Sequence, residues 1–214
     1  MSYENGQIKS INSNSLKLTY EYASDRVIIS NSGTPIYRID IADKLVTRIT
    51  DLKDQSAQQM TYDGNRNLVK IEAYFKGILT DTKIFTYSNG NLASLTQTYH
   101  EERAVKRVTT YNYATEVATK VDTDARSLIF GSLDLYIPSF LTGYISRNIL
   151  TSSLYVYTSG NFRSDINKTY TYTRNVNGTP NKIVENTHAV TVSNGLQTRD
   201  ESTKQTTLIN STCN

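Results

Sequence analysis

Cysteine and tryptophan are almost absent from this chain. Among its 214 residues there is one cysteine, Cys213, and no tryptophan. A single cysteine allows neither an intrachain disulfide nor a thiolate metal cluster, and we expect Cys213 to be an exposed thiol close to the chain end. The opening stretch MSYENGQIKSI lacks the basic and apolar regions of a signal peptide, so none is expected within this chain.

A strong charge of one sign is also missing. The 23 basic and 20 acidic residues give a net charge of +3 and are spread along the sequence. No basic run is present that could neutralise a series of phosphates. Nucleic acid is therefore not an expected partner.

Tyrosine is the aromatic residue that the chain does contain in quantity. It has 16 Tyr against 5 Phe, together with abundant Thr, Ser and Asn, and this composition favours pleated strands over helices. A length of 214 residues is within the range of one all-β domain. We expect a single domain over residues 1–214.

A short pattern recurs along the chain, in which a tyrosine precedes a few turn-forming residues and then an apolar residue. Copies that follow it well are YENGQIKSI from Tyr3, YDGNRNLVKI from Tyr62, YSNGNLASL from Tyr87, YTSGNFRSDI from Tyr157 and YTRNVNGTPNKI from Tyr172. Weaker copies surround Tyr22, Ile41 and Tyr113, and the spacings from Tyr3 to Tyr113 are 19, 19, 21, 25 and 26 residues. Each unit is therefore about one β-hairpin long.

The turn residues support the hairpin interpretation. Asn and Gly tolerate the positive φ of tight hairpin turns, and the strongest turn predictions are Asn5-Gly6, Asn89-Gly90 and Asn194-Gly195. Many strands place aromatic residues two positions apart, on one face: Tyr20/Tyr22, Phe85/Tyr87, Tyr111/Tyr113, Tyr155/Tyr157 and Tyr170/Tyr172. Neighbouring hairpins would assemble these into a cross-strand aromatic ladder.

One segment departs from the pattern. Residues 127–150, SLIFGSLDLYIPSFLTGYISRNIL, are almost continuously apolar, interrupted by Asp134, Arg147, Pro138 and two glycines. A charged residue and a proline inside this run argue against a transmembrane span. We expect a partly helical insert packed on the sheet, and the same segment could also form the wall of a ligand pocket.

Groups suited to catalysis or metal binding are few. His100 and His188 are far apart in the sequence, without a carboxylate-rich partner motif. Asp122 and Asp124 in DTDAR make a poor calcium loop, and no nucleophile elbow or phosphate-binding loop occurs. The sequence therefore predicts no catalytic residue, no metal site and no cofactor.

The repeated tyrosine and Asp/Ser/Asn/Gly turn, with Asn-Leu following it in YDGNRNL and YSNGNL, resembles YD repeats. Together with YIPSFLTGYISRNILTSSLYVY and TYTYTRNVNGTPNKIVE, the order of segments is similar to that of exported Bacteroidetes proteins of unknown function that are often lipoproteins. The resemblance implies export to the periplasm or outer-membrane surface, with a possible lipid anchor upstream of Met1. It carries no catalytic residues.

The expected fold is all-β, a large twisted and curved antiparallel sheet of successive hairpins resembling an open half-barrel, with the insert on its concave side. The expected function is a non-enzymatic binding or scaffolding module of the bacterial cell envelope, whose ligand could be a glycan, a protein or a lipid. The alternative is a periplasmic or outer-membrane carrier of a hydrophobic ligand such as a lipid chain. Speculative ligand-binding residues are Leu135, Phe140, Leu141, Tyr144, Tyr87 and Tyr113.

Overall fold

A computed structural model of the chain describes residues 2–4, 7–13, 16–100, 105–117, 148–176 and 180–208. Within these ranges all regular secondary structure is β-strand, and turns and bends connect the strands. The described residues form no helix that is long and apolar enough to cross a membrane. The described residues fall into two compact units, one ending at Thr82 and the other beginning at Lys83.

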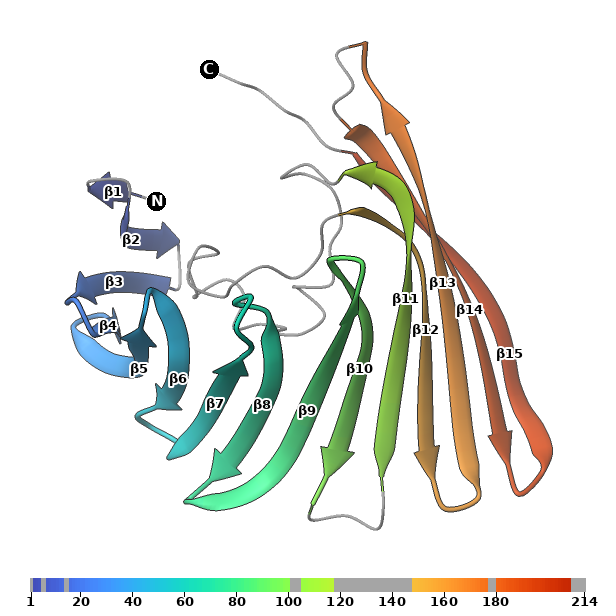
Figure 1. Cartoon of the computed structure of the whole chain (residues 1–214), viewed down its shortest axis with the longest axis horizontal. Coiled ribbons are helices and arrows are strands. Elements are labelled where there is room, and N and C mark those ends of the chain that lie inside the picture. The colour runs from blue at the N-terminus through green and yellow to red at the C-terminus, as the bar shows by residue number, and fades with distance from the viewer. Residues whose placement is uncertain are drawn as a thin grey trace. The chain divides into compact units, whose positions relative to one another are not determined.

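The first unit contains eight strands and the start of a ninth (Figure 1). Their bounds are β1 (Ser2–Glu4), β2 (Gln7–Ser13), β3 (Leu16–Tyr22), β4 (Arg26–Asn31), β5 (Thr34–Ala42), β6 (Leu45–Asp51), β7 (Ser56–Tyr62), β8 (Leu68–Phe75) and β9 (Ile78–Ser88). Most buried side chains of this unit are aliphatic. Val27 and Ile29 alternate along β4, whereas Leu68 and Ile71 on β8 are three positions apart. Ile39 and Ile49, both buried, lie directly opposite each other on β5 and β6, so cross-strand apolar pairs form this core.

The second unit contains the end of β9 and six further strands. Their bounds are β10 (Asn91–Tyr99), β11 (Lys106–Val117), β12 (Asn148–Ser159), β13 (Phe162–Arg174), β14 (Pro180–Ser193) and β15 (Leu196–Leu208). Figure 1 shows β10 to β15 as successive neighbours, and each pairs antiparallel with the next. Leu92, Leu95, Tyr111, Leu150 and Tyr170 are buried in this unit.

The order of pairing follows the order of the sequence from β1 to β15. The prediction of an all-β antiparallel sheet of successive hairpins is therefore confirmed. In the described part of the chain, β1 and β15 are the first and last strands of the pairing order. The half-barrel curvature and the single domain stay predictions. The expected partly helical insert at residues 127–150 lies outside the described residues up to residue 147, but its last three residues, 148–150, begin β12. The insert therefore ends earlier than Leu150, because Ile149 and Leu150 are buried strand residues.

Two of the three strongest turn predictions are confirmed. Asn89 and Gly90 have φ values of 52° and 75°, and Asn194 and Gly195 have values of 50° and 79°. Positive φ at both central residues is the signature of the type I′ hairpin turn. Asn5-Gly6 lies outside the described residues. The weaker copy around Ile41 forms its turn at Asp43 and Lys44, which both have positive φ although neither residue is Asn or Gly.

The repeat YDGNRNL forms a carboxylate-centred loop. Asp63 Oδ1 accepts hydrogen bonds from the backbone N–H groups of Asn65 and Asn67 at 2.9 and 2.8 Å, and Oδ2 accepts one from Asn67 Nδ2 at 2.9 Å. These bonds stabilise the ionised form, so they hold the pKa of Asp63 below its usual value. The acidic residue of this copy is therefore explained by local turn geometry.

The tyrosine of the repeat joins two strands where their pairing ends. The β6–β7 pairing ends at Arg48↔Gln59, and Tyr62, three residues beyond Gln59, donates a hydrogen bond to the Val46 carbonyl oxygen at 2.8 Å. Burial raises the pKa of Tyr62 well above its usual value, so the hydroxyl stays a donor at neutral pH.

The same arrangement recurs in the second unit. The β12–β13 pairing ends at Ser152↔Thr169, and Tyr172, three residues beyond Thr169, donates to the Leu150 carbonyl oxygen at 2.8 Å. In both units the acceptor lies two residues before the last paired residue of its strand. We call this arrangement the tyrosine clasp, and it gives the repeated tyrosine a structural role at these two positions.

Candidate functional site

One face of the second unit gathers side chains from four neighbouring strands. Residues that lie directly opposite each other in an antiparallel pair point to the same face, and here Thr109 lies opposite both Leu95 and Tyr155. Tyr155 in turn lies opposite Ile166. A row of four side chains therefore crosses β10, β11, β12 and β13.

A hollow of about 360 Å³ lies along this row. Its size is at the lower end of the range for small-molecule sites. The lining combines apolar, hydroxyl, amide and cationic side chains: Leu95, Gln97, Arg107, Thr109, Tyr111, Ser153, Tyr155, Ile166 and Lys168. We call it the β10–β13 hollow.

Arg107 lies at one end of the hollow between two aromatic rings. Its guanidinium carbon is 4.7 Å from the centre of the Tyr99 ring and 5.4 Å from the centre of the Tyr157 ring. Both distances are within the range of cation–π attraction. Within the described part of the chain, no carboxylate pairs with Arg107, and its buried Nε has no hydrogen-bond acceptor.

Lys168 lies toward the other end of the hollow and differs from Arg107 in having a partner. Its Nζ is 2.8 Å from Glu185 Oε1, and the same oxygen accepts a hydrogen bond from the Thr187 hydroxyl at 3.1 Å. The charge of Lys168 is therefore largely neutralised from β14. Among the cationic side chains that line the hollow, Arg107 is therefore the one that no described carboxylate neutralises.

The tyrosines of the hollow are held in the neutral form. Burial raises the pKa of Tyr111 and that of Tyr155, and the nearby charge of Arg107 opposes the rise at Tyr155. At neutral pH both rings present an apolar body with a protonated hydroxyl. The hollow thus offers aromatic surfaces, neutral polar groups and one unneutralised cation.

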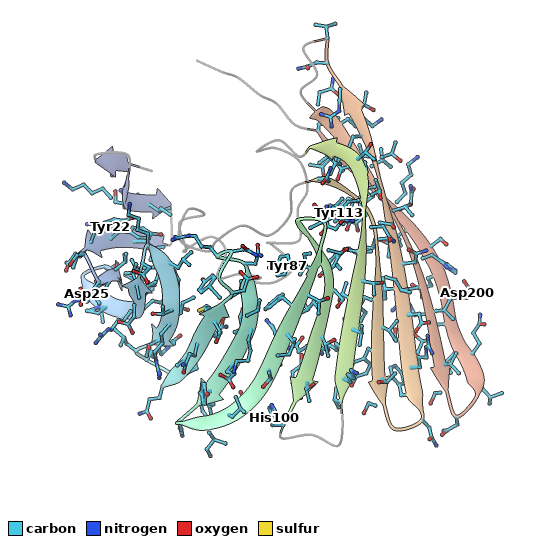
Figure 2. All side chains as sticks on the ribbon, viewed as in Figure 1. Tyr22, Asp25, Tyr87, His100, Tyr113 and Asp200 are labelled. Atoms are coloured by element: carbon cyan, nitrogen blue, oxygen red, sulfur yellow. The ribbon has the colours of Figure 1, made fainter. Side chains whose placement is uncertain are left out.

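The histidines lie away from this hollow. Figure 2 shows His100 at the lower end of β10, whereas Tyr113 lies toward the upper end of β11. His188 is exposed on β14, and its Nε2 is 2.8 Å from Asp200 Oδ1 on β15. The described residues contain no cluster of three or more His, Cys, Asp or Glu side chains that could hold a metal ion. Asp122, Asp124 and Cys213 lie outside the described ranges.

Two of the six speculative ligand-binding residues lie in the described part of the chain, and neither lines the hollow. Tyr87 on β9 and Tyr113 on β11 are half-buried and do not line it. The other four, Leu135, Phe140, Leu141 and Tyr144, lie outside the described residues, so their role as ligand contacts stays a prediction.

Sequence reasoning missed the residues that line the hollow, although the local signals were present. In KRVTTYNY, alternation places Arg107, Thr109 and Tyr111 on one face. Tyr155 belonged to a recognised aromatic pair. Nothing in the sequence shows that β12 returns beside β11 in the register that brings Tyr157 next to Arg107.

Comparison with known proteins gives a likeness of fold to solved structures. No family model matches the chain, and a search of curated proteins found no significant match. Among solved structures, the chain is similar to a porin-like protein from Bacteroides uniformis, with a TM-score of 0.60 and 16% sequence identity. The match covers 94% of this chain and 83% of that one. At this identity the likeness concerns the fold alone.

Proposed function

We propose that the protein is a non-enzymatic binding module of the bacterial cell envelope and that the β10–β13 hollow binds an acidic saccharide. The observation that carries the proposal is the unneutralised Arg107 guanidinium held between the rings of Tyr99 and Tyr157. A planar guanidinium fixed by stacking is preorganised to bind a carboxylate. The buried Nε of Arg107 also has no acceptor, and a buried unsatisfied donor destabilises a protein, so stability alone does not explain the position of Arg107.

The remaining lining favours a sugar as the body of the ligand. Sugar rings present apolar C–H faces to aromatic rings and hydroxyl groups around their edges. Tyr155 and Ile166 offer the apolar surface, while Gln97, Thr109 and Ser153 offer hydrogen-bonding groups beside it. A ligand with a carboxylate at Arg107 and a sugar ring over Tyr155 would use both parts of the lining.

The envelope location rests on two separate observations. The sequence resembles exported Bacteroidetes proteins that are often lipoproteins, and the fold is similar to that of a porin-like protein from Bacteroides uniformis. Both support export to the periplasm or outer-membrane surface. A lipid anchor upstream of Met1 is part of the same proposal.

Calorimetric titration with matched sugars tests the proposal. The probes are a galacturonic acid trisaccharide and a galactose trisaccharide, which differ in their carboxylates. We expect the acidic trisaccharide to bind more tightly, and Arg107→Gln to weaken it by about 10- to 100-fold, because a charged hydrogen bond contributes roughly 1.5 to 3 kcal/mol. Arg107→Lys keeps the charge but loses the planar fork, so it should restore only part of the affinity.

Arg163 provides a matched control. It is an exposed arginine on β13, bound to Asp165 by two hydrogen bonds of 2.7 and 2.8 Å, and it lies on the opposite face of the sheet. Arg163→Gln should leave sugar binding unchanged. Equal binding of the acidic and neutral sugars, or an affinity that Arg107→Gln does not alter, would contradict the proposal.

A hydrophobic carrier is the second candidate. Leu95, Ile166 and the rings of Tyr111 and Tyr155 give the hollow an apolar component that an acyl chain could contact, with its carboxylate at Arg107. A fluorescent fatty acid included in the same titrations separates the two candidates. Tight binding of the fatty acid without binding of any acidic sugar would favour the carrier, as would a lipid that co-purifies with the wild type and is lost from Phe140→Ala.

A further inference from the structure

The last strand of the described sheet is long and uncovered. All 13 residues of β15 are exposed, and in the described part of the chain β15 pairs with β14 alone. A long strand at the end of a sheet presents a row of backbone donors and acceptors to another strand. Its sequence, LQTRDESTKQTTL, contains no proline or glycine that would prevent pairing.

We infer that β15 pairs antiparallel with β15 of a second copy of this chain. Such a dimer has two-fold symmetry, and its axis must pass through a residue that faces its own copy. Hydrogen-bonded and non-hydrogen-bonded residue pairs alternate along an antiparallel ladder. A two-fold axis between two successive pairs would interchange them, and the two pairs would then have to be of the same type, which the alternation does not allow. The number of possible registers is therefore small.

One register matches the sequence of β15 to itself. If Ser202 faces its own copy, Asp200 lies opposite Lys204 of the second copy, and each dimer contains two such pairs. Leu196 and Leu208, at the two ends of β15, are 72% and 69% exposed. A bulge at Thr198 separates Leu196 from the residues around the axis, so this register is regular over residues 199–205. Across residues 199–205 the two strands pair without interruption, and opposite charges face each other.

The neighbouring symmetric registers are less favourable. An axis at Glu201 places two glutamates opposite each other, and an axis at Asp200 places two aspartates opposite each other. Like charges in directly opposed positions are destabilising. An axis at Thr203 places Lys204 opposite Ser202 and forms no pair of opposite charges. Ser202 is thus the centre that charge complementarity selects.

A charge exchange tests the contact. Sedimentation over micromolar to millimolar concentrations should show a dimer for the wild type. Asp200→Lys places lysines opposite lysines, and Lys204→Asp places aspartates opposite aspartates, so each variant alone should dissociate at least about tenfold more readily. An equimolar mixture of the two variants restores both attractive pairs, and native mass spectrometry should detect the mixed dimer.

Two further variants complete the test. The double variant with Asp200→Lys and Lys204→Asp should form its own dimer again. Asp25→Lys makes the same charge change at an exposed residue of the first unit, labelled in Figure 2, and should leave the dimer unchanged. Because Asp200 also contacts His188, circular dichroism checks that the variants keep their strands. A wild type that stays monomeric throughout, or a dimer that Asp200→Lys does not weaken, would overturn the inference.

Discussion

Removing one hydroxyl group tests whether the tyrosine clasp stabilises the fold. In Tyr62→Phe the ring remains, but the 2.8 Å hydrogen bond to the Val46 carbonyl is lost. The net value of a hydrogen bond is about 0.5 to 1.5 kcal/mol, and a buried acceptor left without a donor costs about 1 to 3 kcal/mol. Val46 is fully buried, so we expect a loss of about 1 to 2 kcal/mol in the free energy of unfolding.

Urea unfolding followed by circular dichroism measures this loss, with Tyr74→Phe as the control. Tyr74 is half-buried on β8, and within the described residues its hydroxyl makes no hydrogen bond. Tyr172→Phe repeats the test in the second unit, where the bond to Leu150 has the same length. If Tyr62→Phe costs no more than Tyr74→Phe, or less than the 0.5 kcal/mol or so of ordinary surface substitutions, the clasp is not a stabilising element.

Alkaline pH gives an independent check on the same bond. Burial raises the pKa of Tyr62 in the folded state, whereas in the unfolded state the phenol ionises near its ordinary value of about 10. The stabilisation is therefore fully present below pH 10 or so and is lost as pH rises toward the folded-state pKa. The difference in stability between wild type and Tyr62→Phe should shrink above that pH. A constant difference would contradict the explanation.

Three further predictions concern other parts of the chain. Asn148→Ala should cost about 1 to 3 kcal/mol in urea unfolding, because Asn91 Nδ2 donates to Asn148 Oδ1 at 3.0 Å and Asn91 is buried; a neutral effect would refute a structural role for this pair. The β10–β11 pairing ends at Ser94↔Thr110, and Tyr113 lies three residues beyond Thr110, as in the two tyrosine clasps. The same geometry predicts that Tyr113 donates a hydrogen bond to the Leu92 carbonyl oxygen, two residues before Ser94, and a crystal structure checks this directly. Screens on esters, phosphates and glycosides should find no turnover that is abolished by His100→Ala, and such a loss would refute the non-enzymatic proposal.

The hairpin turns and the pairing of neighbouring strands could be predicted because they depend on the backbone preferences of residues close together in the sequence. Asn89-Gly90 and Asn194-Gly195 favour a positive φ wherever they occur, so the hairpin turns follow from the residues themselves. Antiparallel pairing of sequence neighbours follows from short turns, because they leave no room for any other connection. The turn at Asp43 and Lys44 belongs to a weaker copy of the repeat because neither residue is Asn or Gly, and the paired strands on either side favour the turn there.

The sequence by itself therefore determined the class of structure, the order of the hairpins and most turn positions. Tertiary structure alone decided the candidate site. Arg107 lies between Tyr99 and Tyr157 because β11 pairs with β10 on one side and with β12 on the other. The partner on β12 is 50 residues away in the sequence, and a shift of one residue in that register would turn Tyr157 to the opposite face. Turn residues act on their own backbone, whereas the neighbours of a side chain depend on the packing of strands that are distant in the chain.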